Sequence, residues 1–244
     1  MPPIASELTL SLYNFKMLEE TEDLDEAQSW AHSALGVNNA AKYFMGAENF
    51  VVAYKNAESF SFVIEGESIY SQLYGPNAHF DERCQSVALA DSSRETFHGL
   101  KRGGSSQFWE AKTRENGFKI ELLEDYSEIN DIIDEHALDS SVRPGDPEEI
   151  FWGGVRNEFG ELASLAAVVK WQSGLHVMVS VVTRSQDRGK GLATKLSAGM
   201  VSHAFLLGIS EVGLGIRDGN FAAVRVYEKT GFNKLANFTR YSRE

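Results

Sequence analysis

The sequence has little of what disulfide-rich, metal-binding and disordered proteins are built from. Its 244 residues include one cysteine, Cys84, which excludes an internal disulfide framework and a cysteine-rich metal site. It has only 5 prolines, and 43% of its residues are apolar, which is typical of a chain that folds around a hydrophobic core. These features favour a globular protein of a reducing compartment, and we expect it in the cytoplasm.

Basic charge and long apolar runs are also scarce. The chain has 23 Lys and Arg residues against 35 Asp and Glu residues, a net charge of −12. This excess predicts no binding to nucleic acid and favours a cationic or amine-bearing partner. No run of about 18 apolar residues occurs, and the N-terminus lacks a basic leader followed by an apolar core. We therefore expect neither a membrane span nor a signal peptide.

The order of the expected elements divides the chain into residues 1–117 and 118–244. In the first part, hydrophobic patterns predict one or two helices within 22–45, a two-stranded hairpin within 50–64, and a further helix within 81–102. In the second part they predict nine elements and one loop. These are a strand at 119–123, a helix at 126–138, a loop at 140–149, strands at 150–157, 161–171 and 175–183, a helix at 192–208, a strand at 211–216, a helix at 221–232 and a strand at 234–242.

This pattern predicts the fold class. Three consecutive strands joined by short turns form an antiparallel meander, and the later strands alternate with helices. We therefore expect an α/β (α+β) protein with a mixed, mostly antiparallel central sheet flanked by helices.

A glycine-rich turn, RGKGLA at residues 188–193, joins a predicted strand to a predicted helix. The first backbone N–H groups of a helix lack partners within it, so they attract anions. Gly189 and Gly191 let the backbone approach a phosphate closely, while Arg188 and Lys190 add positive charge. The turn fits a pyrophosphate, although a turn that merely joins a strand to a helix has the same appearance. The Walker and dinucleotide-binding patterns both fail at this position.

A second segment, from Asn220 to Phe232, follows about thirty residues later. The two segments together resemble the GNAT superfamily of N-acetyltransferases, and the resemblance covers residues 118–244. That family has an R/Q-x-x-G-x-G/A loop that binds acetyl-CoA, and an N-x-x-A-x-x-x-Y-x-x-x-G-F helix near the thioester. The matching residues are Arg188, Gly191, Ala193, Asn220, Ala223, Tyr227, Gly231 and Phe232. A shifted register of the loop, with Gln186, Gly189 and Gly191, also satisfies its pattern.

The resemblance implies acetyl-CoA as cosubstrate, with no metal, and a set of site residues. The pantetheine arm would pair with the end of the strand at 175–183, and Tyr227 would donate a proton to the departing thiolate. The residues implied to bind the cofactor are Val181, Val182, Thr183, Arg188, Gly189, Lys190, Gly191, Leu192, Ala193, Thr194 and Asn220. Helical spacing also allows Tyr227 to be a core aromatic, and Asn220 to be a helix cap.

The general base is not evident. Many members of the family carry a glutamate on the strand before the loop, but the strand at 175–181 reads LHVMVSV and has no carboxylate. His176 has a suitable pKa range, yet a lone histidine near a strand start is more often a surface or hydrogen-bonded residue. Glu148, Glu149 and Glu161 near strand ends are no better placed, which leaves a chain of water molecules as a further alternative.

Residues 1–117 carry no motif of similar specificity. The stretch FWEAKTRENGF at 108–118 resembles the end of the Tyr227 helix, and the resemblance suggests that this part is a degenerate GNAT-like domain without its cofactor loop. A separate α/β cap that shapes the acceptor site is the alternative.

The leading hypothesis is an N-acetyltransferase that moves the acetyl group of acetyl-CoA to a primary amine by direct attack in a ternary complex. The acceptor would be a small-molecule or peptide amine, and the sequence leaves a homodimer open. One alternative is a non-catalytic acyl-CoA-binding or regulatory module. Another is a nucleotide-binding protein that uses RGKG for phosphate.

Overall fold

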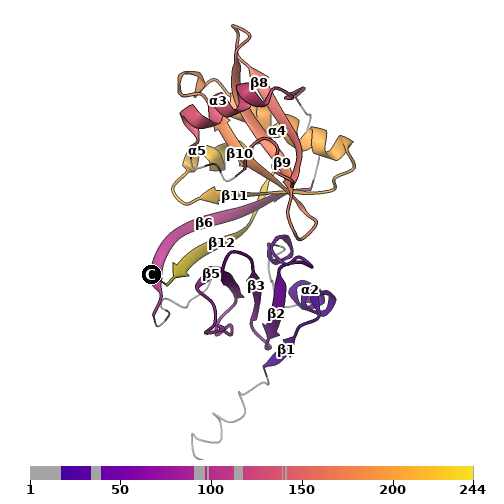
Figure 1. The fold of residues 1–244 in the computed structure, drawn as a ribbon, viewed down its shortest axis with the longest axis vertical. Helices are drawn as coiled ribbons and strands as arrows, with labels where there is room; N and C mark the ends of the chain where they lie inside the picture. Colours follow the sequence, from indigo (N-terminus) through magenta and orange to yellow (C-terminus); the bar gives the residue numbers. More distant parts are fainter. Residues whose placement is uncertain are drawn as a thin grey trace, which may run out of the picture. The chain divides into compact units, whose positions relative to one another are not determined.

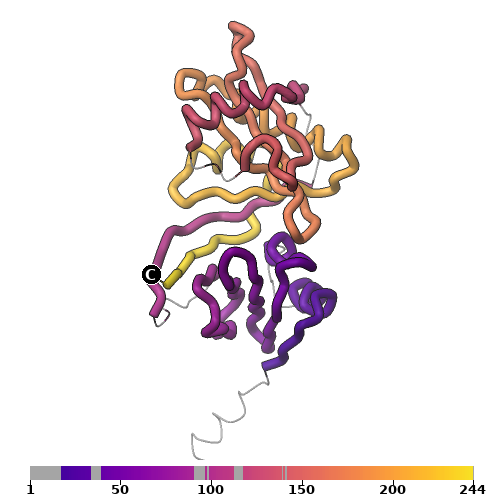
Figure 2. Tube along the Cα trace, viewed as in Figure 1, coloured from indigo at the N-terminus to yellow at the C-terminus, as the bar shows by residue number. Residues whose placement is uncertain are grey.

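The computed structural model describes residues 18–33, 40–90, 97, 99–112, 118–138, 140 and 142–243, which Figure 2 traces in colour. The chain forms two compact units. The first is Met1–Gly103 together with Phe238–Glu244, and the second is Gly104–Asn237. Within the described ranges, no helix has the length and apolar character needed to cross a membrane.

The first unit is built on a mixed sheet (Figure 1). Its elements are β1 (Glu19–Thr21), α2 (Leu24–Ser33), the 3-10 helix η1 (Ala41–Tyr43), β2 (Phe50–Lys55), β3 (Phe60–Glu65), β4 (Ile69–Tyr74) and β5 (Ser86–Ala90). Strand β12 (Asn233–Ser242) adds its residues from Phe238 onward beside β5. The strand order is β1-β2-β3-β4-β5-β12, and β4–β5 is the parallel pair.

The second unit repeats this arrangement. Its elements are β7 (Glu121–Leu122), α3 (Tyr126–His136), β8 (Glu149–Arg156), β9 (Leu162–Lys170), β10 (His176–Thr183), the 3-10 helix η2 (Ser185–Asp187), α4 (Leu192–Leu206), β11 (Val212–Arg217) and α5 (Phe221–Glu228). Strand β6 (Lys101–Ala111) pairs with β11 through Ser106–Ala111. The order is β7-β8-β9-β10-β11-β6, with β10–β11 as the parallel pair.

The last strand of each sequence half completes the sheet of the other unit. Strand β6 follows β5 in the chain, yet it is the edge partner of β11 in the second unit. Strand β12 follows α5, yet its residues from Phe238 onward pair with β5 in the first unit. The compact units are therefore not continuous halves of the sequence.

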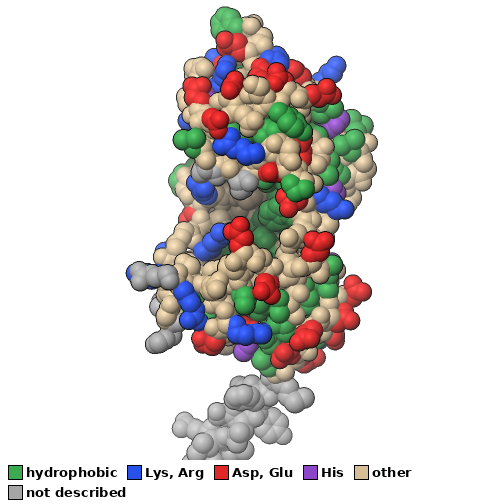
Figure 3. Space-filling model, in the orientation of Figure 1, with side chains coloured by type: hydrophobic (Ala, Val, Ile, Leu, Met, Phe, Trp, Pro, Cys, Tyr) green, Lys and Arg blue, Asp and Glu red, His purple; other side chains and the backbone are tan. Residues whose placement is uncertain are grey.

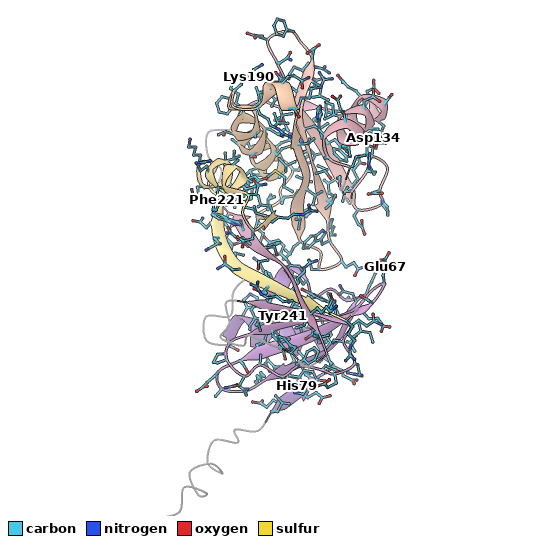
Figure 4. The ribbon with its side chains drawn as sticks, turned by 90° about the vertical axis from the view of Figure 1, so that its left-hand side faces the viewer. Glu67, His79, Asp134, Lys190, Phe221 and Tyr241 are labelled. Carbon is cyan, nitrogen blue, oxygen red and sulfur yellow. The ribbon has the colours of Figure 1, made fainter. Side chains whose placement is uncertain are left out.

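Helices cover both faces of the second sheet, as Figure 4 shows. On one face, α4 and α5 pack on a core that includes Leu196, Met200, Leu214 and Tyr227. On the other face lies α3, which begins at the Asp125 cap and buries Ile129, Ile132 and Ile133 at helical spacing. Because β9 is covered on both sides, its residues from Leu162 to Val169 are all buried, which accounts for their continuous apolar sequence.

The predicted mixed, mostly antiparallel sheet flanked by helices is confirmed, and so are the meander and the helices of the second half. The helix expected within 81–102 is wrong, because Ser86–Ala90 form β5 between β4 and β12. The stretch 108–118 resembles the end of the Tyr227 helix in sequence, but its residues Phe108–Ala111 lie in β6, and residues 113–117 fall outside the described ranges. At 119–123 only Glu121 and Leu122 pair as a strand.

Strand β10 has an irregular middle. Its register with β9 shifts between Val179 and Val182, which marks a bulge. Ser180, inside this bulge, has φ +52°, a left-handed conformation that glycine usually adopts. The Ser180 hydroxyl donates to the carbonyl oxygen of Val142 at 3.2 Å and shares a 2.6 Å hydrogen bond with the Ser140 hydroxyl. These contacts from the loop after α3 hold the strained residue in place.

Truncation should reveal the exchanged strand. A fragment of residues 118–244 lacks β6, so Trp109 and Ala111 leave the core and β11 loses its hydrogen-bonded neighbour. We expect no cooperative thermal transition by near-UV circular dichroism. A fragment of residues 104–237, which keeps β6, should melt cooperatively. Equal cooperativity of the two fragments would contradict the exchange, and would favour the division after Gly117, which stays a prediction.

Substitutions at Ser180 should separate backbone strain from hydrogen bonding. Alanine and glycine both remove the hydroxyl, but only alanine must keep a Cβ at φ +52°. Ser180→Ala should therefore lower the free energy of unfolding by about 1 kcal/mol more than Ser180→Gly, measured by urea denaturation.

Ser127, in the first turn of α3, is the matched control for this pair. At position 127 the glycine variant should have the lower free energy of unfolding of the two, because glycine is a poorer helix former than alanine. If alanine is as well tolerated as glycine at position 180, the left-handed conformation is not a source of strain.

Candidate functional site

An open strand edge is the main feature of the second unit. Strand β10 pairs with β11 only through His176 with Val212 and Val177 with Gly213. Beyond Val177, no residue of β10 pairs with β11 in the described part of the chain. The residues predicted to meet the pantetheine arm, Val181 to Thr183, lie on this open stretch.

The opposite edge of the same stretch is fixed to β9. The Ser164 hydroxyl donates to the carbonyl oxygen of Val182 at 2.8 Å and shares a 2.7 Å hydrogen bond with the Thr183 hydroxyl. Ser164 is fully buried. The side chain of Thr183 therefore contacts β9, which leaves the backbone of β10 as the group that can meet a ligand at the open edge.

The glycine turn runs from this edge into α4. Gly189 and Gly191 have φ +80° and +76°, and a Cβ built at either would meet no atom within 4 Å. The two glycines are therefore required by the backbone conformation and not by crowding. Gly191 is the N-cap of α4, and no side chain caps the helix. The N–H groups of the first turn, including those of Leu192, Ala193 and Thr194, are left to bind an anion.

The charges of the turn differ from the expectation. Lys190 Nζ lies 2.8 Å from Oδ1 of Asp187, a side chain that is only 1% exposed. Hydrogen bonding from Lys190 is the main cause that lowers the pKa of the Asp187 carboxyl below its usual range. The positive charge of Lys190 is thus largely balanced by the carboxylate of Asp187. Arg188 has no ion pair among the residues described, and its Nε donates to the carbonyl oxygen of Thr183 at 3.3 Å.

Tyr227 lies near the C-terminal end of α5, on the core side of the sheet. Its side chain is 6% exposed, and its ring packs edge-on against Phe232 with centroids 5.5 Å apart. Burial raises the pKa of the Tyr227 hydroxyl well above its usual value of 10.0, and no charge or hydrogen bond contributes to this shift. The hydroxyl therefore stays protonated over the whole neutral range and can donate.

Asn220 caps α5. Its side-chain oxygen accepts a hydrogen bond from the Ala223 N–H at 3.1 Å. The capping interpretation is confirmed. Contact with a cofactor stays a prediction, because a cap at the start of α5 does not exclude it. Figure 4 labels Phe221, the first residue of α5, on the same side of the sheet as Lys190, which precedes α4.

The candidate bases named from the sequence are dispersed. Glu149 accepts from the Tyr126 hydroxyl at 2.9 Å, and Glu161 accepts from the Asn157 side chain at 3.0 Å. His176 starts β10 and lines a hollow with the residues that follow α4. Burial, with a smaller effect of Lys170, lowers the pKa of its imidazole. Its role as a base stays a prediction.

One residue was missed by sequence reasoning. Glu110 lies near the C-terminal end of β6, is 4% exposed, and pairs with Gly213 of β11. A charged residue within the apolar run FWEA is a signal for a strand with one functional side chain. The likeness of this stretch to the Tyr227 helix led away from that interpretation.

On the face that Figure 3 shows, acidic and basic side chains are interspersed, so the acidic excess forms no single patch there.

Comparisons with known proteins agree with this geometry. The sequence model of the Acetyltransferase (GNAT) family matches residues 114–232. No curated protein matches the sequence.

Three solved structures share the fold. A GCN5-related N-acetyltransferase from Sphaerobacter thermophilus has 13% identity and a TM-score of 0.55, over 93% of this chain and 95% of its own. One from Kribbella flavida has 15% identity and a TM-score of 0.54, over 76% and 87%. An acetyltransferase of the GNAT family from Colwellia psychrerythraea has 12% identity and a TM-score of 0.53, over 93% and 100%. Residues 114–232 therefore form a domain of the acetyltransferase (GNAT) family, and the three solved structures show that the fold is shared.

Proposed function

We propose that the protein is an N-acetyltransferase that transfers the acetyl group of acetyl-CoA to a primary amine within a ternary complex. The observation that carries the proposal is the open edge of β10, which leads directly into the uncapped start of α4. A strand edge and a helix N-terminus in sequence suit a ligand with an amide-containing arm and a pyrophosphate.

Binding would use backbone groups throughout. The amides of the pantetheine arm would pair with Val181 to Thr183 in the manner of an added strand. The pyrophosphate would accept hydrogen bonds from the N–H groups of residues 189–194, with Arg188 as the cation beside it. With the pyrophosphate at this loop, the thioester would point along β10 toward Val177, where β10 and β11 meet.

The chemistry would then be a direct displacement. The neutral amine attacks the carbonyl carbon, the C–N bond forms, and the tetrahedral intermediate is stabilised by a backbone N–H near Val181. The C–S bond breaks, and the thiolate takes a proton from the Tyr227 hydroxyl. An acyl-CoA-binding module without catalysis remains the alternative that the experiments below separate from this proposal.

The first unit is expected to take no part in cofactor binding. Its parallel pair β4–β5 stays hydrogen-bonded from Tyr70 with Ser86 to Tyr74 with Ala90, so no edge opens. Residues 75–85, which are all described, lead from β4 to β5 without a helix. In the described ranges, the site therefore occurs once.

Binding and turnover test the proposal together. Isothermal titration should give one acetyl-CoA per chain, and thiol release should identify an acceptor from a panel of amines. Tyr227→Phe should lower kcat about a hundredfold with unchanged affinity for acetyl-CoA. Because the pKa of the Tyr227 hydroxyl lies above 10, ionisation of this group should not reduce kcat up to about pH 10.

Tyr126→Phe is the matched control, since it removes a hydroxyl from an exposed tyrosine of the same unit. If Tyr227→Phe leaves kcat unchanged across pH, its role as the acid is wrong. Binding of acetyl-CoA without acetylation of any amine would favour the module instead.

The two cations of the loop should differ in importance. Arg188→Met should raise the Kd for acetyl-CoA about tenfold, the loss of one charge-assisted hydrogen bond of about 1.4 kcal/mol. The double change Asp187→Asn with Lys190→Met removes one negative and one positive charge that already balance each other. It should therefore change the Kd for acetyl-CoA less than threefold. The reverse order would mean that Lys190, and not Arg188, binds the pyrophosphate.

A further inference from the structure

Strand β6 brings a carboxylate to the point where β10 and β11 part. Glu110 is the direct cross-strand partner of Gly213. Gly213 is in turn the partner of Val177, the last residue of β10 that pairs with β11. Directly paired residues share a face of a sheet, and glycine places no side chain between its two neighbours. Glu110 and Val177 therefore border the same gap.

The face on which Glu110 lies follows from its neighbours. Trp109 and Ala111 belong to the core under α4 and α5, together with Tyr227. Because side chains alternate along a strand, Glu110 lies on the opposite face. Glu110 therefore lies on the face of the sheet opposite to the core that contains Tyr227.

The strand register places Glu110 two strands away from Val177. Neighbouring strands are about 4.8 Å apart, so the Cα atoms of Glu110 and Val177 are separated by about 10 Å. A glutamate side chain spans roughly half of this gap.

The surroundings of Glu110 support a buried charge. Lys112 Nζ lies 3.0 Å from Glu110 Oε2 and 3.7 Å from Glu211 Oε2. An ion pair of this kind offsets the cost of burying a carboxylate.

We propose that Glu110 is the general base of the acetyl transfer, a role that rests on the proposed function. The ammonium of the acceptor gives one proton to the Glu110 carboxylate, directly or through a water molecule. The freed lone pair forms the C–N bond, the C–S bond breaks, and the thiolate takes its proton from Tyr227. Glu110 then returns its proton to solvent. The strand that the first sequence half contributes thus supplies the carboxylate that β10 lacks.

Glu110→Gln tests this assignment in the full-length chain. With acetyl-CoA and the acceptor amine identified by thiol release, kcat at pH 7 should fall about a hundredfold while the Kd for acetyl-CoA is unchanged. The deficit should shrink as the pH approaches the pKa of the amine, because the amine then loses its proton without a base. With hydroxylamine, which is unprotonated at neutral pH, the deficit should almost vanish.

Glu211→Gln is the matched control, because it removes the other carboxylate beside Lys112 and should keep kcat within twofold of the wild type. If Glu110→Gln does not fold, Glu110→Asp is the second variant. Aspartate keeps the base one methylene farther away, so kcat should fall while the pH profile keeps its shape.

Three results would overturn the assignment. A deficit of Glu110→Gln that is equal at every pH and with hydroxylamine would indicate a structural role. A pH-dependent deficit in His176→Gln, with none in Glu110→Gln, would make His176 the base. If wild-type protein acetylates no amine at all, the proposed function itself fails, whereas an active wild type with an unaffected Glu110→Gln variant contradicts this inference alone.

Discussion

In the part of the chain that the structure describes, β10 pairs with β11 only through His176 with Val212 and Val177 with Gly213. The rest of β10 keeps its bonds to β9 but presents a free backbone edge toward β11. Contacts away from the edge stabilise the strand. Ser180 in the bulge is hydrogen-bonded to the loop after α3, and α4 and α5 pack on the core. The edge of β10 that is proposed to meet the cofactor exists because of this separation.

The first unit shows that topology alone does not create the site. It has the same strand order and the same single parallel pair as the second unit. There, however, β4 and β5 pair over five residues, from Tyr70 with Ser86 to Tyr74 with Ala90, and the hydrogen-bonding groups that a pantetheine arm needs are used within the sheet. A site is a local departure from a fold, and in this chain only one of two similar sheets makes that departure.

Exchange of the terminal strands makes each unit depend on residues from the other half of the sequence. Strand β6 fills the edge of the second sheet, contributes Trp109 and Ala111 to its core, and carries Glu110 on the opposite face. Strand β12 does the same for the first sheet with Phe238 and Tyr241, which are both buried. A boundary drawn from motifs after Gly117 falls between β6 and β7, which both belong to the second unit.

The sequence by itself determined the features that arise from neighbours along the chain. Helical spacing identified α3, α4 and α5, and the turn at 188–193 was recognised because positive φ at Gly189 and Gly191 is a local requirement. Tertiary structure decided the features that depend on distant partners. Residues Ser86–Ala90 form strand β5 because they pair with β4 on one side and with β12 on the other. The charge of Lys190 is balanced because the fold buries the carboxylate of Asp187 beside it. The position of Glu110 beside Gly213 required the register between β6 and β11, about a hundred residues apart, and no local pattern encodes a pairing of that kind.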